Sequence, residues 1–323
     1  MTEERFFVTG AMGCIGSWVV RNLVQSGTAT AVLDLSQNHQ RLELIMTPGE
    51  IAQIQFFQGD VADFEQVRRV LAEFNPTAII HLAALQLPFC AADPVLGAQV
   101  NVVGTVNVFE AARQLGLKGL VYASSAAVYG LSAEYPEGPL AHEAALKPRS
   151  LYGVYKQANE GTARVYWMNH GLASIGLRPY VVYGPGRDQG MTSTPTKAML
   201  AAAAGQPYRI SYGGRFGFQY ADDVAKTFIQ AARAQYAGAE AFNIGGGLVS
   251  MSQIITEIER CLPARRGTIT YEEAPLPFPE DMDNRALRRA IGPLPETPLA
   301  QGVEETIRIF RRALVEGKVR LEA

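Results

Sequence analysis

Apolar residues in the first half of the chain fall into two recurring patterns. Short continuous runs predict buried strands, and they occupy residues 6–8, 30–33, 54–57, 78–82 and 119–123. The stretches between them carry apolar residues three or four positions apart, as at Ile15, Val19 and Leu23. This spacing predicts helices, the clearest over 64–74 and 94–115. Strands that alternate with helices in this way predict an α/β fold, with a parallel sheet covered by helices on both faces.

The pattern changes near Leu177, where prolines and glycines interrupt the chain. Beyond this point we expect shorter elements: a helix over about 252–262, a strand over 267–271, a proline-rich stretch over 274–279 and a last helix over about 303–315. The sequence therefore predicts a large cofactor-binding domain over residues 1–176 and a smaller substrate-binding lobe over 177–323. Within that lobe, residues 220–245 are the segment that could instead return to the large domain.

Three glycines, Gly10, Gly13 and Gly16, follow the first predicted strand and lead into the first predicted helix. Glycine at this spacing permits a tight turn, close approach of a diphosphate to the backbone and close packing of the helix on the sheet. The helix N-terminus then attracts the phosphates. Asp34 ends the next strand, about 20 residues on, where a carboxylate can hydrogen-bond an adenosine ribose. The combination predicts a Rossmann-type, doubly wound sheet that binds a dinucleotide; the alternative is an ordinary strand–turn–helix with an unrelated aspartate.

The acidic side chain also bears on which dinucleotide binds. A carboxylate at Asp34 would repel the 2′-phosphate of NADP, so the sequence favours NAD. Asn38, His39 and Arg41 follow it closely and could change the shape of this pocket.

A tyrosine and a lysine four residues apart, Tyr152 and Lys156, would share one face of a helix. A tyrosine that works as an acid or base near neutrality needs a pKa below its usual value of about 10, and a nearby ammonium lowers it. Lys156 could also hold the ribose hydroxyls of the nicotinamide half. Tyr155 points elsewhere on such a helix, so Tyr152 is the candidate. The alternative is a chance pairing, which is common on helices.

Two serines, Ser124 and Ser125, stand at the carboxyl end of the predicted strand 119–123. In an open parallel sheet, ligands bind at that end of the strands. A serine there can hydrogen-bond a substrate oxygen beside Tyr152 and stabilise charge as it develops. The alternative is that both serines only cap the loop. A nucleophilic role is not expected, because the chain has no G-x-S-x-G sequence.

Composition narrows the class of protein. The chain has 323 residues, 48% of them hydrophobic, and a net charge of −2 without a long basic tract, so nucleic acid is not an expected partner. We find no apolar run long enough to span a bilayer and no signal peptide, so no membrane partner is expected. Three single cysteines suit a reducing cytoplasm, and four scattered histidines make a metal site unexpected.

Together these sequence motifs resemble those of the extended short-chain dehydrogenase/reductase family, also called NAD-dependent epimerase/dehydratases. The resemblance covers nearly the whole chain. Besides the glycine loop, Asp34 and the Tyr152–Lys156 pair, its motifs are Gly59-Asp60, His81-Leu82-Ala83-Ala84, Asn101-Val102-x-Gly104-Thr105, Ser124-Ser125-Ala126-Ala127-Val128-Tyr129-Gly130, Arg178-Pro179, Tyr183-Gly184-Pro185-Gly186 and Tyr220-Ala221-Asp222-Asp223-Val224-Ala225.

The resemblance implies an NAD cofactor and a role for each matching position. The cofactor-binding set would be Gly10, Gly13, Cys14, Ile15, Gly16, Asp34, Asp60, Val61, Ala83, Ala84, Lys156 and Pro179. Tyr152 would be the general acid/base with Lys156 as its partner, and Ser125 would donate to the substrate carbonyl. Asn101 would complete the catalytic set by ordering the helix or a water behind Lys156, although a surface or capping asparagine is an equal alternative.

Departures from the family pattern bear on the substrate. Dehydratases carry Asp-Glu where this chain has Ala126-Ala127, so dehydration lacks its usual acid and base. Nucleotide-sugar members carry an asparagine at the position of Val181 and an arginine near Phe216, and apolar replacements remove diphosphate contacts. Arg215 stands one residue early and is the candidate substitute for that arginine.

We therefore expect an NAD-dependent enzyme that transfers hydride reversibly at a secondary alcohol or ketone of a small, sugar-like, polyhydroxylated substrate. Arg187 or Arg215 would meet an acidic group on it. The outcome is net oxidation or epimerisation. The alternatives are a nucleotide-sugar 4-epimerase with tightly held NAD, and a redox-sensing regulator. Family members commonly dimerise through two helices, here about 94–115 and 152–169, so we expect a homodimer.

Overall fold

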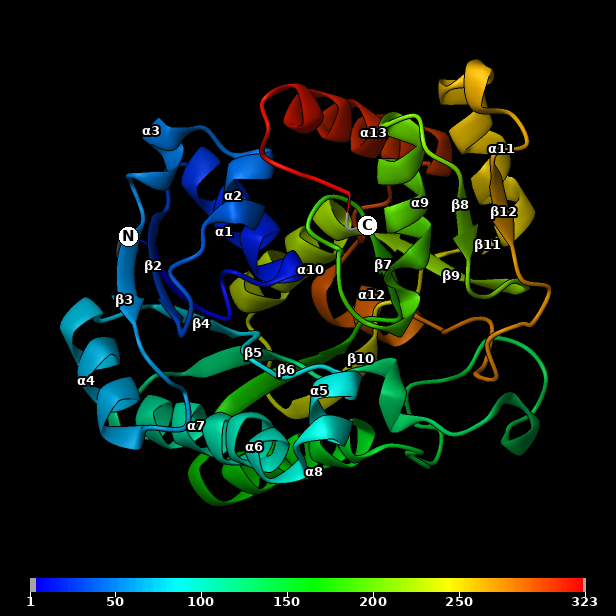
Figure 1. Ribbon diagram of the computed structural model, residues 1–323. Coiled ribbons are helices and arrows are strands. Elements are labelled where there is room, and N and C mark those ends of the chain that lie inside the picture. Colours follow the sequence, from blue (N-terminus) through cyan, green and yellow to red (C-terminus); the bar gives the residue numbers. More distant parts are fainter. Residues whose placement is uncertain (1–3, 322–323) are drawn as a thin grey trace.

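The computed structural model describes residues 4–321, and a seven-stranded parallel sheet runs through its centre (Figure 1). The strand order is β10-β6-β5-β4-β1-β2-β3. The strands are β1 (Arg5–Thr9), β2 (Ala29–Asp34), β3 (Gln55–Gln58), β4 (Ala78–His81), β5 (Gly119–Ala123), β6 (Ala173–Arg178) and β10 (Ala239–Asn243). The chain builds outward from β1 to β3 and then returns to β4 on the other side of β1, which is the switch point where such sheets bind ligands. The predicted fold class is confirmed.

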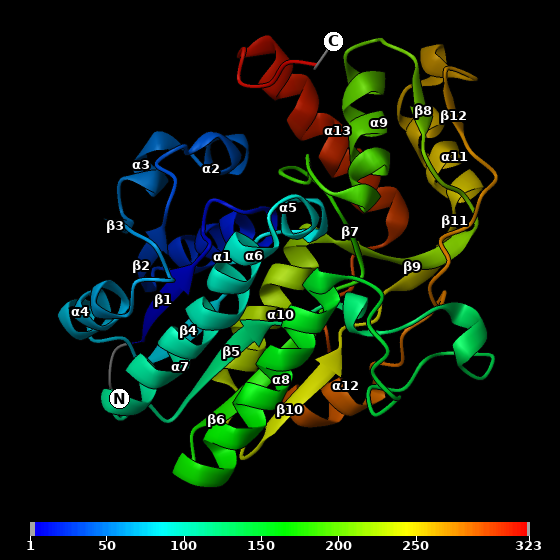
Figure 2. The same ribbon diagram turned by 60° about the horizontal axis from the view of Figure 1, so that its bottom comes forward.

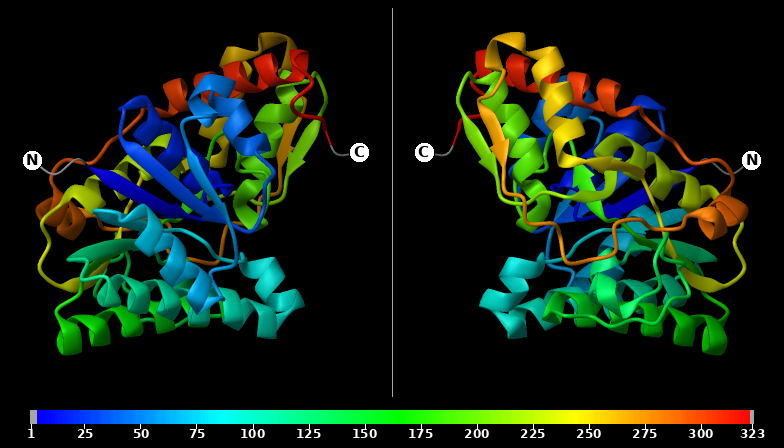
Figure 3. Two further views of the ribbon diagram at one scale, coloured as in Figure 1. Left: turned by 90° about the vertical axis from the view of Figure 1, so that its left-hand side faces the viewer. Right: turned by 90° about the vertical axis from the view of Figure 1, so that its right-hand side faces the viewer.

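Helices cover both faces of this sheet (Figure 3). On one face lie α1 (Cys14–Gln25) and α10 (Ala221–Arg233), and on the other lie α4 (Phe64–Phe74), α7 (Gly104–Gln114) and α8 (Leu151–His170). Neighbouring residues of one strand therefore enter different cores: Phe6 and Val8 of β1 pack with α1 and α10, whereas Phe7 packs with α4 and α7. Burial on both faces explains the continuous apolar runs of the strand sequences.

The remaining elements gather beside the large sheet (Figure 2). A three-stranded sheet has the order β11 (Gly247–Ser250), β9 (Arg215–Tyr220), β7 (Val181–Tyr183), and β8 (Tyr208–Ile210) pairs with β12 (Ile269–Tyr271). The helices here are α9 (Thr194–Ala203), α11 (Met251–Cys261), α12 (Arg285–Ile291) and α13 (Leu299–Val315). The helices and the strand predicted for the C-terminal half are thus confirmed as α11, α13 and β12.

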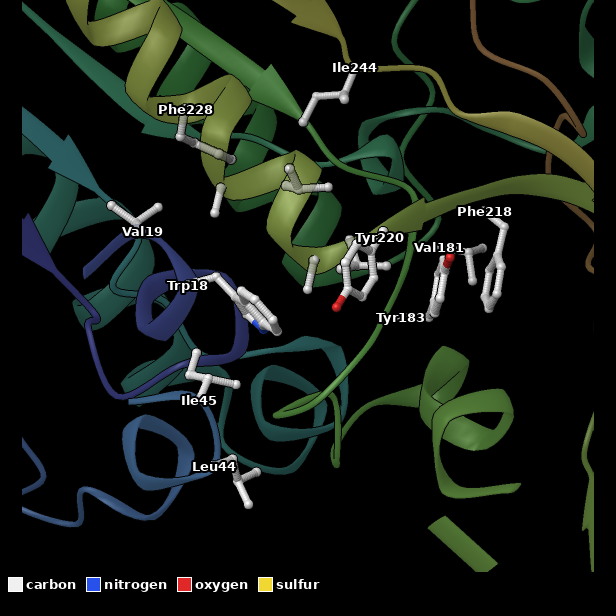
Figure 4. Close-up of a cluster of buried hydrophobic side chains, with 14 of the residues drawn as sticks. Trp18, Val19, Leu44, Ile45, Val181, Tyr183, Phe218, Tyr220, Phe228 and Ile244 are labelled. Atoms are coloured by element: carbon white, nitrogen blue, oxygen red, sulfur yellow. The ribbon is translucent and has the colours of Figure 1, made fainter. Parts of the chain in front are cut away.

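Two features of the large sheet bear on the expected division of the chain. β6 runs to Arg178 and so crosses the expected boundary at residue 176. The segment 220–245 supplies α10, which packs on α1, and β10, which pairs with β6. Figure 4 shows Trp18 of α1 facing Tyr220 at the end of β9, and the two rings meet edge to face with centroids 5.6 Å apart. The large sheet therefore takes its last strand from the second half of the chain.

The helix expected over 94–115 is confirmed over Pro94–Gln114, with a π-helical turn in its middle. It consists of α6 (Pro94–Ala98), the π-helical turn η1 (Gln99–Val103) and α7, and α5 (Leu87–Ala92) precedes it. A π-turn inserts one residue into the helix and rotates the side chains there. In η1 it directs Asn101 into the interior, where the residue is fully buried. The stretch Pro94–Gln114 is also long and apolar enough to cross a membrane by length and composition, contrary to our expectation, and half of it is buried inside the protein.

A buried histidine ties the ends of β1 and β4 to this helix. Thr9 Oγ1 accepts from the backbone N–H groups of Leu82 and Ala83, both at 3.2 Å, so its own proton goes to His81 Nδ1 at 2.7 Å. His81 Nε2 therefore carries the ring proton and donates to Thr105 Oγ1 at 3.0 Å. A second ring proton would find no acceptor on Nδ1, and burial together with the charge of Lys156 lowers the pKa of His81 to about 3.

This histidine predicts an acid-sensitive fold. Because the unfolded chain binds a proton on His81 near pH 6.5 and the folded chain near pH 3, stability falls as the pH drops through this window. The contribution is up to about 1.4 kcal/mol per pH unit. We expect urea unfolding between pH 6 and pH 4 to show a steeper loss for the wild type than for His81→Asn. His170→Asn at an exposed position is the control, and equal slopes for wild type and His81→Asn would show that the ring protonates freely.

Candidate active site

A long cleft lies along the carboxyl ends of the parallel strands. It consists of a cavity of about 850 Å³ and a cavity of about 260 Å³, and both are lined by Gly10, Gly13, Leu82, Ala84 and Arg187. Because these walls are shared, the two cavities form one continuous cleft across β1 and β4. This is the switch point of the sheet, so the cleft lies where the sequence predicts a dinucleotide.

The glycine loop forms the middle of the cleft. Gly10 has φ +71°, and a Cβ atom there would stand 2.5 Å from the Ala83 nitrogen. A Cβ at Gly16 would overlap the Gly10 carbonyl oxygen, so both positions require glycine on structural grounds alone. Gly13 caps α1, faces both cavities, and is followed by a first turn without acidic residues. The free N–H groups and positive dipole end of α1 thus face the cleft, and the loop fits a diphosphate.

The larger cavity has the polar groups expected around an adenosine ribose. It is lined by Asp34, Asp60, Val61, Ala83 and Ala84. Asp34 accepts from the Met12 and Ser36 backbone N–H groups at 2.9 and 3.0 Å, which fixes its carboxylate at the end of β2.

Arg41 lies beside that carboxylate and lines the same cavity. It is paired with Asp188 through two hydrogen bonds of 2.7 and 3.0 Å and donates to the Met12 carbonyl at 2.7 Å. A guanidinium engaged in this way is not free for a 2′-phosphate, which agrees with the preference for NAD.

The smaller cavity brings together the residues expected to do chemistry. Tyr152 and Lys156 reach it from α8, and Ser125 reaches it from the turn after β5. The remaining predicted cofactor positions on this side also line it: Cys14, Ile15, Gly16 and Pro179. Ser125 additionally accepts from the Ala127 backbone N–H at 3.1 Å, so it also caps the short 3₁₀ turn Ala126–Val128.

The electrostatics of this pair differ from our expectation. Lys156 Nζ donates to the Ala123 carbonyl at 2.7 Å and lies 5.7 Å from the Tyr152 ring centroid. Burial raises the pKa of Tyr152, and the hydrogen bond with Ser125 and the charge of Arg187 offset this only in part. Burial likewise lowers the pKa of Lys156 to about 8. We expected Lys156 to lower the pKa of Tyr152. In the protein alone this expectation is wrong, because desolvation of the phenol outweighs the nearby charges.

Two predicted site residues do not line the cleft. Arg215 is exposed at the start of β9 and is absent from the described lining of both cavities. Asn101 lies behind the wall, where its side chain accepts from the Leu85 N–H at 2.7 Å and donates to the Leu85 carbonyl at 2.9 Å. The surface or capping alternative for Asn101 is wrong, because the residue is fully buried. Its side chain holds the loop after β4 in place.

The sequence analysis did not identify a buried ion pair that joins α8 to the end of β6. Glu160 of α8 accepts from Arg178 Nε and Nη2, each at 2.7 Å, and from the Ser124 hydroxyl at 2.5 Å. Arg178 ends β6 and also donates to the Tyr129 hydroxyl at 2.6 Å. Both charged side chains are almost fully buried, with exposures of 5% and 7%. Residue spacing could have pointed to Glu160, because it follows Lys156 by four residues and so lies on the helix face that carries Tyr152.

Comparison with known proteins agrees with this geometry. The model of the NAD dependent epimerase/dehydratase family matches residues 6–245. A UDP-glucose 4-epimerase from Mycolicibacterium smegmatis is 30% identical over 318 residues, which cover 95% of this chain and 98% of that protein. The crystal structure of Thermus thermophilus UDP-glucose 4-epimerase in complex with NAD superposes with a TM-score of 0.80 at 29% identity, covering 96% of this chain and 99% of the other.

A third comparison concerns the fold alone. An L-threonine dehydrogenase from Cupriavidus necator superposes with a TM-score of 0.80 at 22% identity, over 96% of this chain and 99% of the other. A shared fold does not select a substrate, so the site residues themselves carry that question.

Because the Glu160–Arg178 pair is buried, we expect removal of the Glu160 carboxylate to lower the free energy of unfolding strongly. In Glu160→Gln the Arg178 guanidinium would remain buried without a counter-charge, and such losses cost about 3–5 kcal/mol. We expect a correspondingly lower free energy of unfolding in urea. Glu65→Gln removes the acid of an exposed pair with Arg68, held at 2.6 Å, and should cost at most about 0.5 kcal/mol. Equal losses for both variants would contradict the role given to the buried pair.

Proposed function

The chain belongs to the NAD-dependent epimerase/dehydratase family, and on that premise we propose that it moves hydride reversibly at a secondary alcohol carbon of a small, sugar-like, polyhydroxylated substrate. One observation carries the proposal: Tyr152, Lys156 and Ser125 line the same cavity as the glycine loop. A dinucleotide that lies across the loop therefore has its reactive end beside a phenol, a hydroxyl and an ammonium. These are the groups that proton transfer at an alcohol requires.

Each side chain has a distinct part in that chemistry. NAD, when bound, supplies the hydride acceptor. Tyr152 takes the hydroxyl proton of the substrate, and Ser125 holds the same oxygen by a hydrogen bond and stabilises charge on it. The Lys156 ammonium lies on the next turn of α8, fixed by the Ala123 carbonyl, and favours the phenolate form that Tyr152 needs in order to accept the proton. The apolar walls exclude water and strengthen these interactions.

The same residues serve oxidation and epimerisation. An epimerase returns hydride to the opposite face of the carbon and keeps its cofactor, whereas a dehydrogenase exchanges it. NAD retained through purification, without net turnover of free NAD, would favour the epimerase.

Dehydration has less support, because Ala126 and Ala127 line the cavity where an acid and a base would be needed. A regulator without catalysis has less support too, because the phenol, the hydroxyl and the ammonium are all present.

A nucleotide-sugar 4-epimerase is the second candidate, since relatives with that activity match nearly the whole chain. The structure gives it less support. Val181 and Phe216, at the positions where an asparagine and an arginine would hold a nucleotide, are fully buried in the hydrophobic core. Arg215, the possible replacement, lies outside the cleft lining. We therefore favour a substrate without a nucleotide.

We also propose a homodimer formed through α6, η1 and α8, which lie together on one side of the molecule (Figure 2). These helices expose several large apolar side chains, and monomeric soluble proteins rarely expose so many close together. They are Val95, Leu96, Val103, Leu151, Val154, Val165 and Met168.

Removing the phenolic oxygen tests the catalytic proposal. Tyr152→Phe should lower kcat by about 10²–10⁴-fold in an assay of NADH absorbance, since proton transfer loses its acceptor. The dissociation constant of NADH, measured by fluorescence, should stay within about threefold of the wild type. Tyr155→Phe is the control, because the Tyr155 hydroxyl bonds the Pro94 carbonyl outside the cavity, and it should keep its activity. Full activity in Tyr152→Phe would refute the assignment.

A charge placed in the apolar face tests the dimer. Sedimentation of the wild type should give twice the chain mass of 35.0 kDa, and Val165→Glu on α8 should shift it to the monomer. Val315→Glu, at an exposed position of α13, should leave the mass unchanged. A monomeric wild type would contradict the proposal.

A further inference from the structure

The described lining of the smaller cavity includes one arginine, Arg187, in addition to Tyr152 and Lys156 of α8. Arg187, in the loop after β7, donates through Nη2 to the Thr192 hydroxyl at 3.0 Å. Its Nε is buried and has no hydrogen-bond partner within residues 4–321. A guanidinium presents five N–H donors in a rigid fork, and a buried donor without an acceptor is unfavourable. A ligand oxygen at this place would therefore satisfy a group that the protein leaves unpaired.

The backbone around Arg187 leaves room for such a ligand. Gly190 has φ +90°, and a Cβ there would stand 2.5 Å from Gln86 Oε1 and 3.3 Å from Arg187 Nη2. Gln86 and Arg187 thus meet at a position without a side chain, and both line the cavity together with Thr192. An amide, a guanidinium and a hydroxyl thus supply polar groups to the same cavity that Ser125, Tyr152 and Lys156 line.

The remaining walls favour a negative charge at that end. The described lining of the smaller cavity contains no aspartate, glutamate or histidine. Much of it is apolar, from Leu82, Leu87, Pro88, Val182, Met191 and Phe278. Ionic interactions are stronger among apolar walls than in water, and a planar guanidinium matches the two oxygens of a carboxylate.

The size of the cavity limits what the negative charge can be attached to. Its volume of about 260 Å³ lies below the roughly 300–1,000 Å³ that drug-sized ligands occupy. Part of this space also lies against Gly13, Cys14 and Gly16, where the cofactor must pass. The space beside Tyr152 therefore suits a small substrate.

We propose that the substrate is a small hydroxy acid, whose carboxylate pairs with Arg187 and whose secondary hydroxyl meets Ser125 and Tyr152. This inference rests on the proposed oxidoreductase function and names its substrate class. The carbinol C–H bond breaks and its hydrogen leaves with both electrons as hydride to NAD⁺. The O–H proton passes to the phenolate of Tyr152, and the phenol formed there later releases it to solvent, so the alcohol becomes a ketone while NAD⁺ becomes NADH. The Arg187–carboxylate pair is unchanged by the step and selects which carbon faces the cofactor.

Matched acids and amides test this assignment. Wild-type protein loaded with NADH is titrated calorimetrically with four- to six-carbon aldonic acids, the corresponding aldonamides and UDP-glucose, and kcat/KM for the same compounds is followed by NADH absorbance with NAD⁺. We expect at least one acid to exceed its amide about 100-fold in both measurements, as for a buried charge-assisted contact. UDP-glucose should bind more weakly than that acid. Equal values for acid and amide, or tighter binding of UDP-glucose, would overturn the assignment.

Variants of the two candidate arginines locate the effect. Arg187→Met should reduce the preference for acid over amide from about 100-fold to below about 10-fold, mainly through KM, and Arg187→Lys should keep part of it. Arg215→Met, at the exposed position outside the cleft, should match the wild type. NADH affinity is measured for each variant, because Arg187 also lines the cofactor cavity. A preference for acid that survives in Arg187→Met would refute the pairing.

The two proposals fail in different ways. If NADH forms with a neutral sugar in a Tyr152-dependent reaction while no acid binds, the hydroxy acid is wrong and the oxidoreductase stands. If acids bind through Arg187 but no compound is oxidised or epimerised, the oxidoreductase is wrong and the anion site stands.

Discussion

One buried ion pair fixes the helix that carries the residues we assign to catalysis. Glu160 and Arg178 join the middle of α8 to the end of β6, and the Ser124 hydroxyl at the end of β5 completes the contact. Tyr152, Lys156 and Glu160 repeat at intervals of four, so the residue that anchors the helix lies on the same face as the two that react. An amphipathic helix packed only by apolar contacts could slide or rotate on the sheet. The pair gives α8 one rotation and one height, which places the phenol over the carboxyl ends of β5 and β6.

The other wall of the cleft comes from the second half of the chain. The loop after β7 is attached above the start of α1: the Trp18 indole donates to the Pro185 carbonyl at 3.0 Å, and Arg41 pairs with Asp188. Arg187 lies between these two attachments and faces the smaller cavity. One short loop therefore covers the diphosphate position and also supplies the charge that we assign to substrate recognition. On our assignment, cofactor binding and substrate recognition would share this loop, since Arg187 lines both cavities.

The sequence predicted the parts of the site whose requirements are local. Gly10 and Gly16 are needed by backbone geometry, and Tyr152 and Lys156 need only a helix to share a face. Parts that depend on distant contacts were not predictable. The π-turn at Gln99–Val103 keeps a helical apolar pattern, so nothing in the spacing shows that Asn101 turns inward. Spacing puts Glu160 on the helix face of Tyr152 and Lys156, but it does not show that Arg178 at the end of β6 pairs with it. Arg187 and Arg215 were equal candidates in the sequence, because only the folded paths of their loops show that Arg187 lines the cleft and Arg215 does not. The pKa of Tyr152 depends on burial, which residue spacing does not reveal.

The central claim is that a single cleft brings the diphosphate of NAD to the N-terminus of α1 and its nicotinamide to the phenol of Tyr152. A crystal structure of the protein with NAD bound tests it most directly. We expect the diphosphate against Gly13 and the nicotinamide in the smaller cavity, with its ring within about 4 Å of the Tyr152 hydroxyl oxygen. A nicotinamide bound at Asp34 instead, or a smaller cavity closed to it by the loop after β7, would contradict the claim.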